Sequence, residues 1–218
     1  MKTSHKIVIA IFLASLLIRL VMAFLIPGFT YDSYFHLRQI ENIVNTGMPL
    51  FSDPLSYGGR EIIFLPFFHY FMALFALFIP LEIAAKIIPN LLLATLVITA
   101  YLISRKITKN EAGSLLASFI AGFLPILFST NSVSVMSLFL PLTFFCIYAF
   151  INTQEYAKKK NRKLRKYLYL YLISFLLLSI TSPLAVMLLI GFGIYMLLSL
   201  LERKNINRAE IEIFMFSL

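Results

Sequence analysis

Charged residues and cysteine are scarce in this sequence, and their scarcity excludes whole classes of protein. Only 13% of the 218 residues are charged, whereas 60% are hydrophobic, and the mean hydropathy is +0.88. A soluble domain of this composition would have too few polar residues to cover its surface. The single cysteine, Cys146, excludes an internal disulfide and offers no thiolate cluster for a metal. We therefore predict an all-α membrane protein.

The common motifs of nucleotide binding and hydrolysis are also missing. The chain contains no Walker loop, no Gly-rich dinucleotide fingerprint, no His-Glu-x-x-His and no Gly-x-Ser-x-Gly. These absences exclude the familiar ATPases, dehydrogenases, zinc proteases and serine hydrolases. The first apolar run is too long for a secretory signal and lacks a small-x-small cleavage site, so residues 1–26 are predicted to be a retained first span.

Apolar runs long enough to cross the roughly 30 Å hydrocarbon core as helices recur along the chain. They lie at about residues 7–26, 87–104, 112–128, 135–151, 167–180 and 184–201. A seventh run, 62–79, contains Pro66 and His69 and is followed by Pro80, so it suits a lipid-facing span poorly. We predict a polytopic bundle of about six spanning helices.

The positions of Lys and Arg predict how these helices are oriented. If residues 62–79 do not cross the membrane, 15 of the 19 Lys and Arg residues lie on the cytoplasmic side. Residues 27–86 then form one outer loop with five carboxylates against three basic residues. The positive-inside rule favours this arrangement, with a cytoplasmic N-terminus and a multi-pass protein of the cell membrane. Residues 1–218 are treated as a single transmembrane domain: first span 1–26, outer loop 27–86 with interfacial helices, and remaining helices 87–218.

The net charge of +9 follows from the same short basic loops and does not indicate nucleic-acid binding. The densest basic run, residues 158–166, is expected to contact anionic membrane lipids. The last residues, 210–218, look like the start of another element, so we expect the chain to be the N-terminal part of a larger protein.

A polar segment directly follows the first apolar run and reads Tyr-Asp-Ser-Tyr-Phe-His-Leu-Arg-Gln-Ile-Glu-Asn over residues 31–42. It predicts an interfacial helix with Asp32 at the N-cap and Gly47 at the C-cap. Asp32 could bind a divalent cation or orient an acceptor nucleophile, or it could be a plain helix cap. His36 and Gln39 share its helical face. One carboxylate with one histidine is a weak metal signal, because hard cations prefer several oxygens.

Basic side chains elsewhere in the outer loop have two interpretations each. Arg38 could pair with Glu41 three residues later or contact substrate. Arg60, in a Gly-Gly-Arg turn, could bind a phosphate or anchor the loop to lipid headgroups. His69 could face the same groove or be one of the aromatic residues of a membrane interface. Arg19, inside the first span, could find a partner within the bundle or extend its side chain to the interface.

Several of these stretches together resemble a known family. An Arg in the first helix is followed by the segment at Tyr31–Arg38, then Gly-Met-Pro at 47–49, Asp-Pro-Leu at 53–55 and Phe-Leu-Pro at 64–66. This order is similar to the N-terminal part of the GT-C superfamily of membrane glycosyltransferases, especially the archaeal oligosaccharyltransferase catalytic subunit. The resemblance covers about residues 19–125, and the helical GT-C fold with its long first outer loop agrees with the arrangement predicted from charge.

The resemblance implies transfer of a sugar or oligosaccharide from a polyprenyl-phosphate carrier to an acceptor protein or glycan on the outer membrane face. It implies that Asp32 is the loop aspartate that binds Mg or Mn and faces the acceptor. Substrate contacts are expected from the four basic or imidazole side chains of the loop: His36, Arg38, Arg60 and His69. In the family, a second acidic motif follows a proline in the next outer loop. Here Pro125 is followed by residues 128–136, which contain no carboxylate and offer only Asn131, Ser132 and Ser134 as weak oxygen ligands.

Three functional hypotheses follow from these observations. The first is a glycosyltransferase, or the N-terminal part of one, of archaeal or prokaryotic type. The second is a non-catalytic relative that binds lipid-linked glycan or assembles with a glycosylation complex, which the missing second acidic motif favours. The third is a transporter module, which the scarcity of charge in the later helices disfavours.

Overall fold

The computed structural model describes residues 3–53, 55, 58–124, 130–159, 162–202 and 208–217. This part of the chain is almost entirely helical, with one short antiparallel hairpin of β1 (Ser52–Asp53) and β2 (Arg60–Glu61). The helices are α1 (Thr3–Leu25), α2 (Tyr31–Thr46), α3 (Phe67–Ala76), α4 (Leu81–Ala94), α5 (Leu96–Thr108), α6 (Glu111–Phe123), α8 (Met136–Lys158), α9 (Lys163–Thr181), α10 (Ala185–Leu201) and α11 (Arg208–Ser217).

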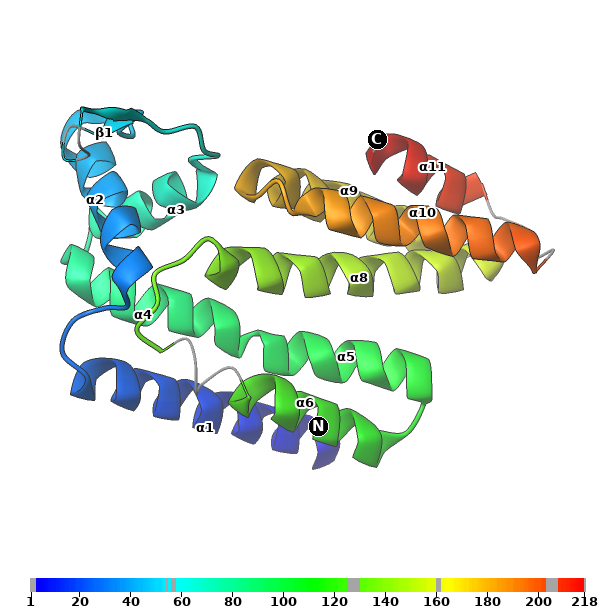
Figure 1. Ribbon diagram of the computed structural model, residues 1–218. Helices are drawn as coiled ribbons and strands as arrows, with labels where there is room; N and C mark the ends of the chain where they lie inside the picture. Colours follow the sequence, from blue (N-terminus) through cyan, green and yellow to red (C-terminus); the bar gives the residue numbers. More distant parts are fainter. Residues whose placement is uncertain are drawn as a thin grey trace.

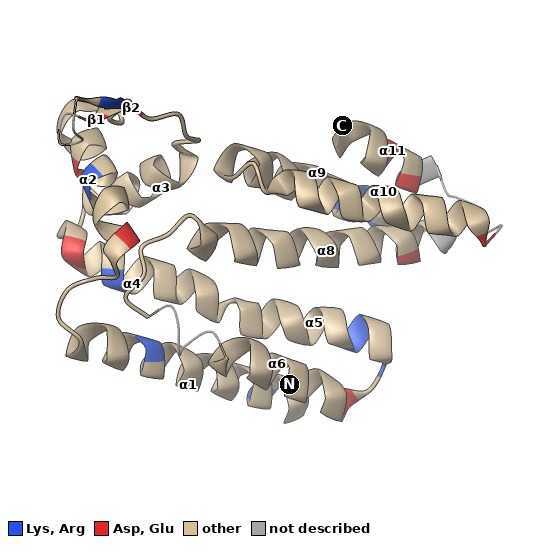
Figure 2. Ribbon diagram, in the orientation of Figure 1, with Lys and Arg blue, Asp and Glu red and all other residues tan. Residues whose placement is uncertain are grey.

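Long apolar helices confirm the predicted helical membrane bundle. Among the described residues, four helices are long and apolar enough to cross a membrane: α1, the continuous pair α4–α5, α8 and α9. The predicted spans 112–128 and 184–201 correspond to α6 and α10, which are shorter, with 13 and 17 residues. Residues 125–128 of the former lie outside the described residues. Figure 2 shows that charged residues gather toward the two ends of the bundle and leave its middle mostly uncharged.

The segment predicted to be an outer loop contains two helices that cap one end of the bundle. Helix α3 has 10 residues and is about 15 Å long, half of what a hydrocarbon core requires, so it does not cross the membrane as a helix. Helix α2 lies across the end of the long helices (Figure 1). A hydrophobic core that includes Ile40, Phe68 and Val133 joins α2 and α3 to the residues before α8 and to α4.

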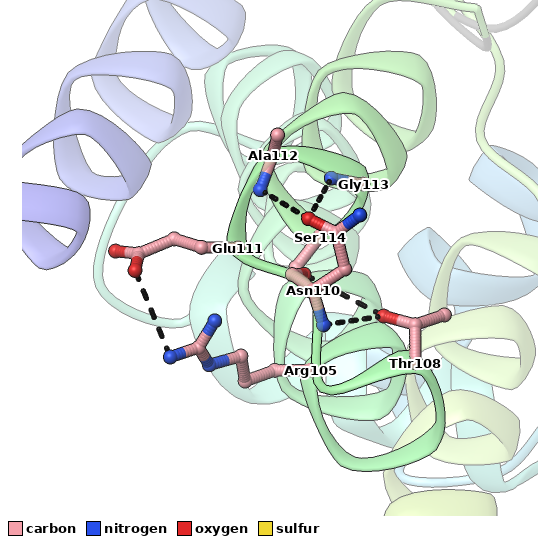
Figure 3. A network of polar contacts seen from close by, with 7 residues as sticks. All are labelled: Arg105, Thr108, Asn110, Glu111, Ala112, Gly113 and Ser114. Atoms are coloured by element: carbon pink, nitrogen blue, oxygen red, sulfur yellow. Dashed lines mark hydrogen bonds and ion pairs between the residues drawn. The ribbon is translucent and has the colours of Figure 1, made fainter.

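The sharp connection between α5 and α6 has an identifiable local cause. Lys109 adopts the left-handed conformation with φ of 55° and ends α5. Asn110 then caps α6, since its Oδ1 accepts hydrogen bonds from the backbone N–H groups of Ala112 at 3.0 Å and Gly113 at 3.4 Å (Figure 3). The polar turn sends α6 back along α5 toward the opposite end.

Close packing of α6 against α1 depends on a small residue. Gly122 is buried, and its carbonyl oxygen accepts a hydrogen bond of 3.0 Å from Ser15 Oγ of α1. A Cβ at position 122 would lie 2.7 Å from Cγ2 of Val97, which is too close. Small residues at such contacts allow helix backbones in a membrane to approach one another.

We expect Gly122→Ala to destabilise the bundle by about 1–3 kcal/mol, because the new methyl group overpacks the α1–α5–α6 contact against a stiff β-branched side chain. Thermal unfolding of the purified protein in detergent, followed by circular dichroism, measures this effect. Gly113→Ala is the matched control, since its Cβ would meet nothing closer than 3.8 Å. Equal melting temperatures for the two variants would contradict the packing argument.

Candidate functional site

The start of α2 places Asp32 at one end of the bundle. Thr30, with φ of −64° and ψ of 155°, is the residue before the helix, and Asp32 lies in the first turn. The prediction that Asp32 is the N-cap was therefore wrong by two positions. Its side chain is exposed to solvent. The predicted C-cap is confirmed, because Gly47 ends α2 with φ of 79°.

A second segment, between α6 and α8, holds the start of α2 in place. The backbone N–H of Thr30 donates to the carbonyl oxygen of Asn131 at 3.0 Å. The N–H of Val133 donates to Ser33 Oγ at 2.8 Å. These bonds join residues about one hundred positions apart in the chain, so the turn that carries Asp32 is fixed by the tertiary fold rather than by α2 alone.

Asn131 was considered as a weak oxygen ligand, and the structure shows a structural contact for it. Its side chain is buried, and Nδ2 donates to the carbonyl oxygen of Ile26 at the end of α1. Asn90 of α4 makes a parallel contact, with Nδ2 2.7 Å from the carbonyl oxygen of Thr130. Both amides donate to backbone carbonyls, and that of Ile26 is one that the end of α1 leaves free.

Arg19 is fully buried, so its side chain does not extend to the interface. Its Nη1 lies 3.4 Å from Oδ1 of Asn90, which confirms a partner inside the bundle. A buried guanidinium requires such polar contacts because its desolvation is costly. Through Asn90, Arg19 thus contributes to the hydrogen-bond network that holds the first turn of α2 and Asp32 in place.

The structure brings His36 and His69 together. Nδ1 of His36 and Nε2 of His69 lie 2.8 Å apart, with Phe35, Phe64 and Phe68 around the pair. His69 is only 1% exposed. Burial, reinforced by the neighbouring His36, lowers the pKa of His69 from 6.5 to about 3. Burial also lowers the pKa of His36, an effect that the negative charge of Asp32 opposes.

Arg38 and Arg60 belong to a second group beside the β-hairpin. Arg38 Nη1 binds Asp53 Oδ1 at 2.8 Å, a partner that neither of its two interpretations from the sequence had named. Arg60 is exposed and lies opposite Asp53 in the hairpin register. Six residues separate Asp32 from Arg38, which puts them on different faces of α2. The hairpin therefore presents Arg60 to solvent while Arg38 positions the hairpin.

Gln39 has a structural role that the sequence pattern did not reveal. Its side chain is buried, and it bonds both backbone groups of Leu50, donating at 3.1 Å and accepting at 2.8 Å. It therefore does not converge with Asp32 on a solvent-facing site. Its amide fixes the chain between α2 and the hairpin. The structural roles of Ser33 and Asn90 were missed in the same way, and their only sequence signal is a polar residue at the edge of an apolar run.

The donor set around Asp32 does not form a preorganised metal site. Across the described ranges, no three His, Cys, Asp or Glu side chains lie close enough together to hold a metal ion. His36 interacts electrostatically with Asp32, but its Nδ1 is already hydrogen-bonded to His69. A hard divalent cation requires several oxygen ligands, and this part of the chain supplies one carboxylate.

These features define a helical membrane protein with an exposed carboxylate and a buried imidazole pair where α2 caps the bundle. Over 101 residues the chain is 35% identical to "Dolichyl-phosphooligosaccharide-protein glycotransferase 2" of Archaeoglobus fulgidus. The match covers 44% of this chain and 17% of that protein. No protein-family model matches the chain. The similarity supports an oligosaccharyltransferase-like relationship at a coarse level.

We expect the packing of α2 against α3 to weaken in acid. Unfolded histidine titrates near pH 6.5, whereas His36 and His69 bind protons only at lower pH when folded. The stability that the neutral pair provides is thus present above pH 6.5 and lost as the pH falls from about 6.5 toward 3. Hydrogen exchange of peptides from α2 and α3, corrected for the intrinsic pH dependence, measures this loss.

His69→Gln is the matched variant for this measurement, because the amide can bond His36 but does not titrate in this range. Its pH dependence should be smaller than that of the wild type by half or more. Peptides from α6 serve as the internal control. Identical protection of α2 and α3 at pH 7.5 and pH 5 in the wild type would disprove the prediction.

Proposed function

We propose that this protein is a membrane glycosyltransferase, or part of one, that transfers a sugar or oligosaccharide from a polyprenyl-phosphate carrier to an acceptor protein or glycan outside the cytoplasm. The observation that carries the proposal is the exposed carboxylate of Asp32. It is held at the end of the bundle that α2 caps by hydrogen bonds between two distant segments. The named activity of the archaeal relative supports the reaction class.

Asp32 is proposed to orient and activate the acceptor nucleophile. Its carboxylate is exposed in the first turn of α2, so an acceptor can reach it from solvent. The hydrogen bonds beneath it limit its movement, and positioning of a reactive pair supplies a large share of the rate in group transfer. His36 lies one turn further along α2 and contributes a polar contact to the same substrate.

Of the remaining side chains, Arg60 keeps the role expected from the sequence, whereas Arg38 and His69 are assigned different ones. Arg60 is exposed on the hairpin and is proposed to bind the carrier phosphate. Arg38 is paired with Asp53 and His69 is buried, so both are proposed to position their neighbours rather than to contact substrate. If a divalent cation, Mg or Mn, binds with the carrier, Asp32 would hold it, and the cation would supply positive charge opposite the carrier phosphate.

A second candidate function is binding of lipid-linked glycan without transfer. The observation that favours it is the segment from 130 to 136, which contains Asn131 and three serines or threonines but no carboxylate. In this alternative the same end of the bundle binds the carrier, and Asp32 contributes affinity alone. The two candidates differ in whether product forms when purified protein meets a lipid-linked sugar.

Asp32→Ala should lower transfer of labelled sugar from a polyprenyl-phosphate donor by about 100-fold or more, because a positioned base typically contributes that much. The variant should still insert in the membrane and keep its helix content. Glu41→Ala is the matched control, since Glu41 is an exposed carboxylate on the same helix. Transfer by the Asp32 variant at the wild-type rate would refute the assignment. Binding of the donor by wild type without any product would instead establish the second candidate.

Arg60→Ala should raise the KM for the lipid-linked donor by about ten-fold with little change in kcat, because a charge-assisted bond to phosphate is made in the ground state. Arg60→Lys should recover part of the affinity. Arg162→Ala removes an exposed cation before α9 and serves as the control. An unchanged KM in Arg60→Ala would show that the hairpin arginine does not contact the carrier.

A further inference from the structure

The end of the bundle farthest from α2 contains a cleft rich in basic residues. Its volume is about 530 Å³, and it lies between the ends of α5 and α8. Four cationic side chains and one carboxylate line it: Arg105, Lys106, Lys109, Lys159 and Glu155. In Figure 1 the ends of α5 and α8 are at the side of the bundle opposite α2.

The ion pairs within the cleft leave it cationic. Glu155 binds both Lys106 and Lys159, at 2.5 and 2.6 Å. Arg105 reaches Glu111 at 3.7 Å, outside the cleft lining (Figure 3). Among the described residues, Lys109 makes no ion pair. An anion that enters the cleft would therefore meet uncompensated positive charge.

An apolar groove begins where this cleft ends. It has a volume of about 740 Å³ and runs between α8 and α10, from Met136 and Leu184 at one end to Gln154 and Tyr195 at the other. Nearly all of its lining is apolar side chain. At the helical rise per residue, Met136 and Gln154 are about 27 Å apart along α8, close to the thickness of a hydrocarbon core.

The cleft and the groove share two wall residues, Ile151 and Gln154. Gln154 Nε2 is buried and has no hydrogen-bond partner within the described part of the chain. A buried amide donor without a partner costs free energy, so an acceptor that binds at the junction would be stabilised by a hydrogen bond from it. The cationic cleft, the unpaired amide donor of Gln154 and the apolar groove therefore meet at one place.

We propose that this composite site binds an anionic phospholipid of the membrane. The phosphate headgroup lies in the cleft and accepts a hydrogen bond from Gln154, while one acyl or isoprenoid chain lies in the groove along α8. Charge complementarity identifies the headgroup, since basic clusters at the membrane boundary attract anionic lipids. The apolar groove identifies the tail, because it is continuous with the surrounding hydrocarbon. This site is separate from Asp32 and does not depend on the function proposed above.

The test uses the full chain in detergent, stripped of lipid, and titrated with fluorescent phosphatidylglycerol or phosphatidylcholine. Wild type should prefer phosphatidylglycerol. Lys109→Asn removes the unpaired charge while Asn tolerates the left-handed backbone at this position. This variant and Gln154→Leu should each weaken phosphatidylglycerol binding by about five-fold.

Gly191→Phe tests the groove independently of charge. A Cβ at position 191 meets nothing within 4 Å, so the ring should fill the groove without disturbing α10. It should weaken binding of phosphatidylglycerol, whereas Leu197→Phe, at an exposed position on the side of the same helix that faces away from the groove, should not. Lys166→Asn is the charge control, since Lys166 is exposed on α9 outside the cleft.

Equal binding of the two lipids, or wild-type affinity in Lys109→Asn, Gln154→Leu and Gly191→Phe, would overturn the proposal. A polyprenyl phosphate that binds the site while phosphatidylglycerol fails to displace it would also overturn it, because the occupant would then be the carrier. Circular dichroism of each variant confirms that a loss of binding is not a loss of fold. Gln154→Leu keeps the test informative if Gly191→Phe does not fold.

Discussion

Buried hydrogen bonds between side-chain amides and backbone carbonyls determine where α2 lies, and the rest of the candidate site depends on them. Asn131 bonds the last carbonyl of the α1 region, and Asn90 bonds Thr130 while it accepts from Arg19. In a low-dielectric interior such bonds are strong and costly to break. They fix the end of α1, the residues before α8 and the middle of the α4–α5 helix relative to one another. The first turn of α2, with Asp32, is attached to this framework through Asn131 and Val133.

The two ends of the bundle differ in chemistry, and α8 connects them. At one end, α2, α3 and the hairpin present a carboxylate, an arginine and a neutral histidine pair. At the other, α5 and α8 form a cationic cleft. The helix between them offers an apolar face along its length. A protein that handles lipid-linked substrate at one face and is held by lipid at the other would require this division of charge, because polar groups are tolerated mainly at the membrane boundaries.

Much of the fold followed from the sequence, and the exceptions have specific causes. Apolar length and the basic loops predicted the helical membrane bundle, and Gly47 correctly predicted the end of α2. For Arg38 the sequence offered Glu41 or substrate as a partner, whereas the hairpin supplies Asp53. Helical periodicity placed Gln39 beside Asp32, yet its amide is used to hold Leu50. Local spacing identifies neighbours on one helix, whereas these partners come from other segments.

By itself, the sequence determined the class of protein, because burial of so many apolar residues within a bilayer depends on composition and run length alone. It also determined that one polar segment after the first span would carry Asp32 and His36. Only the tertiary structure decided what those side chains contact. The pairing of His36 with His69, the burial of Arg19 and the support of the Asp32 turn by Asn131 all join residues far apart in the chain. Such contacts are selected by the packing of whole helices, which no local pattern of residues encodes.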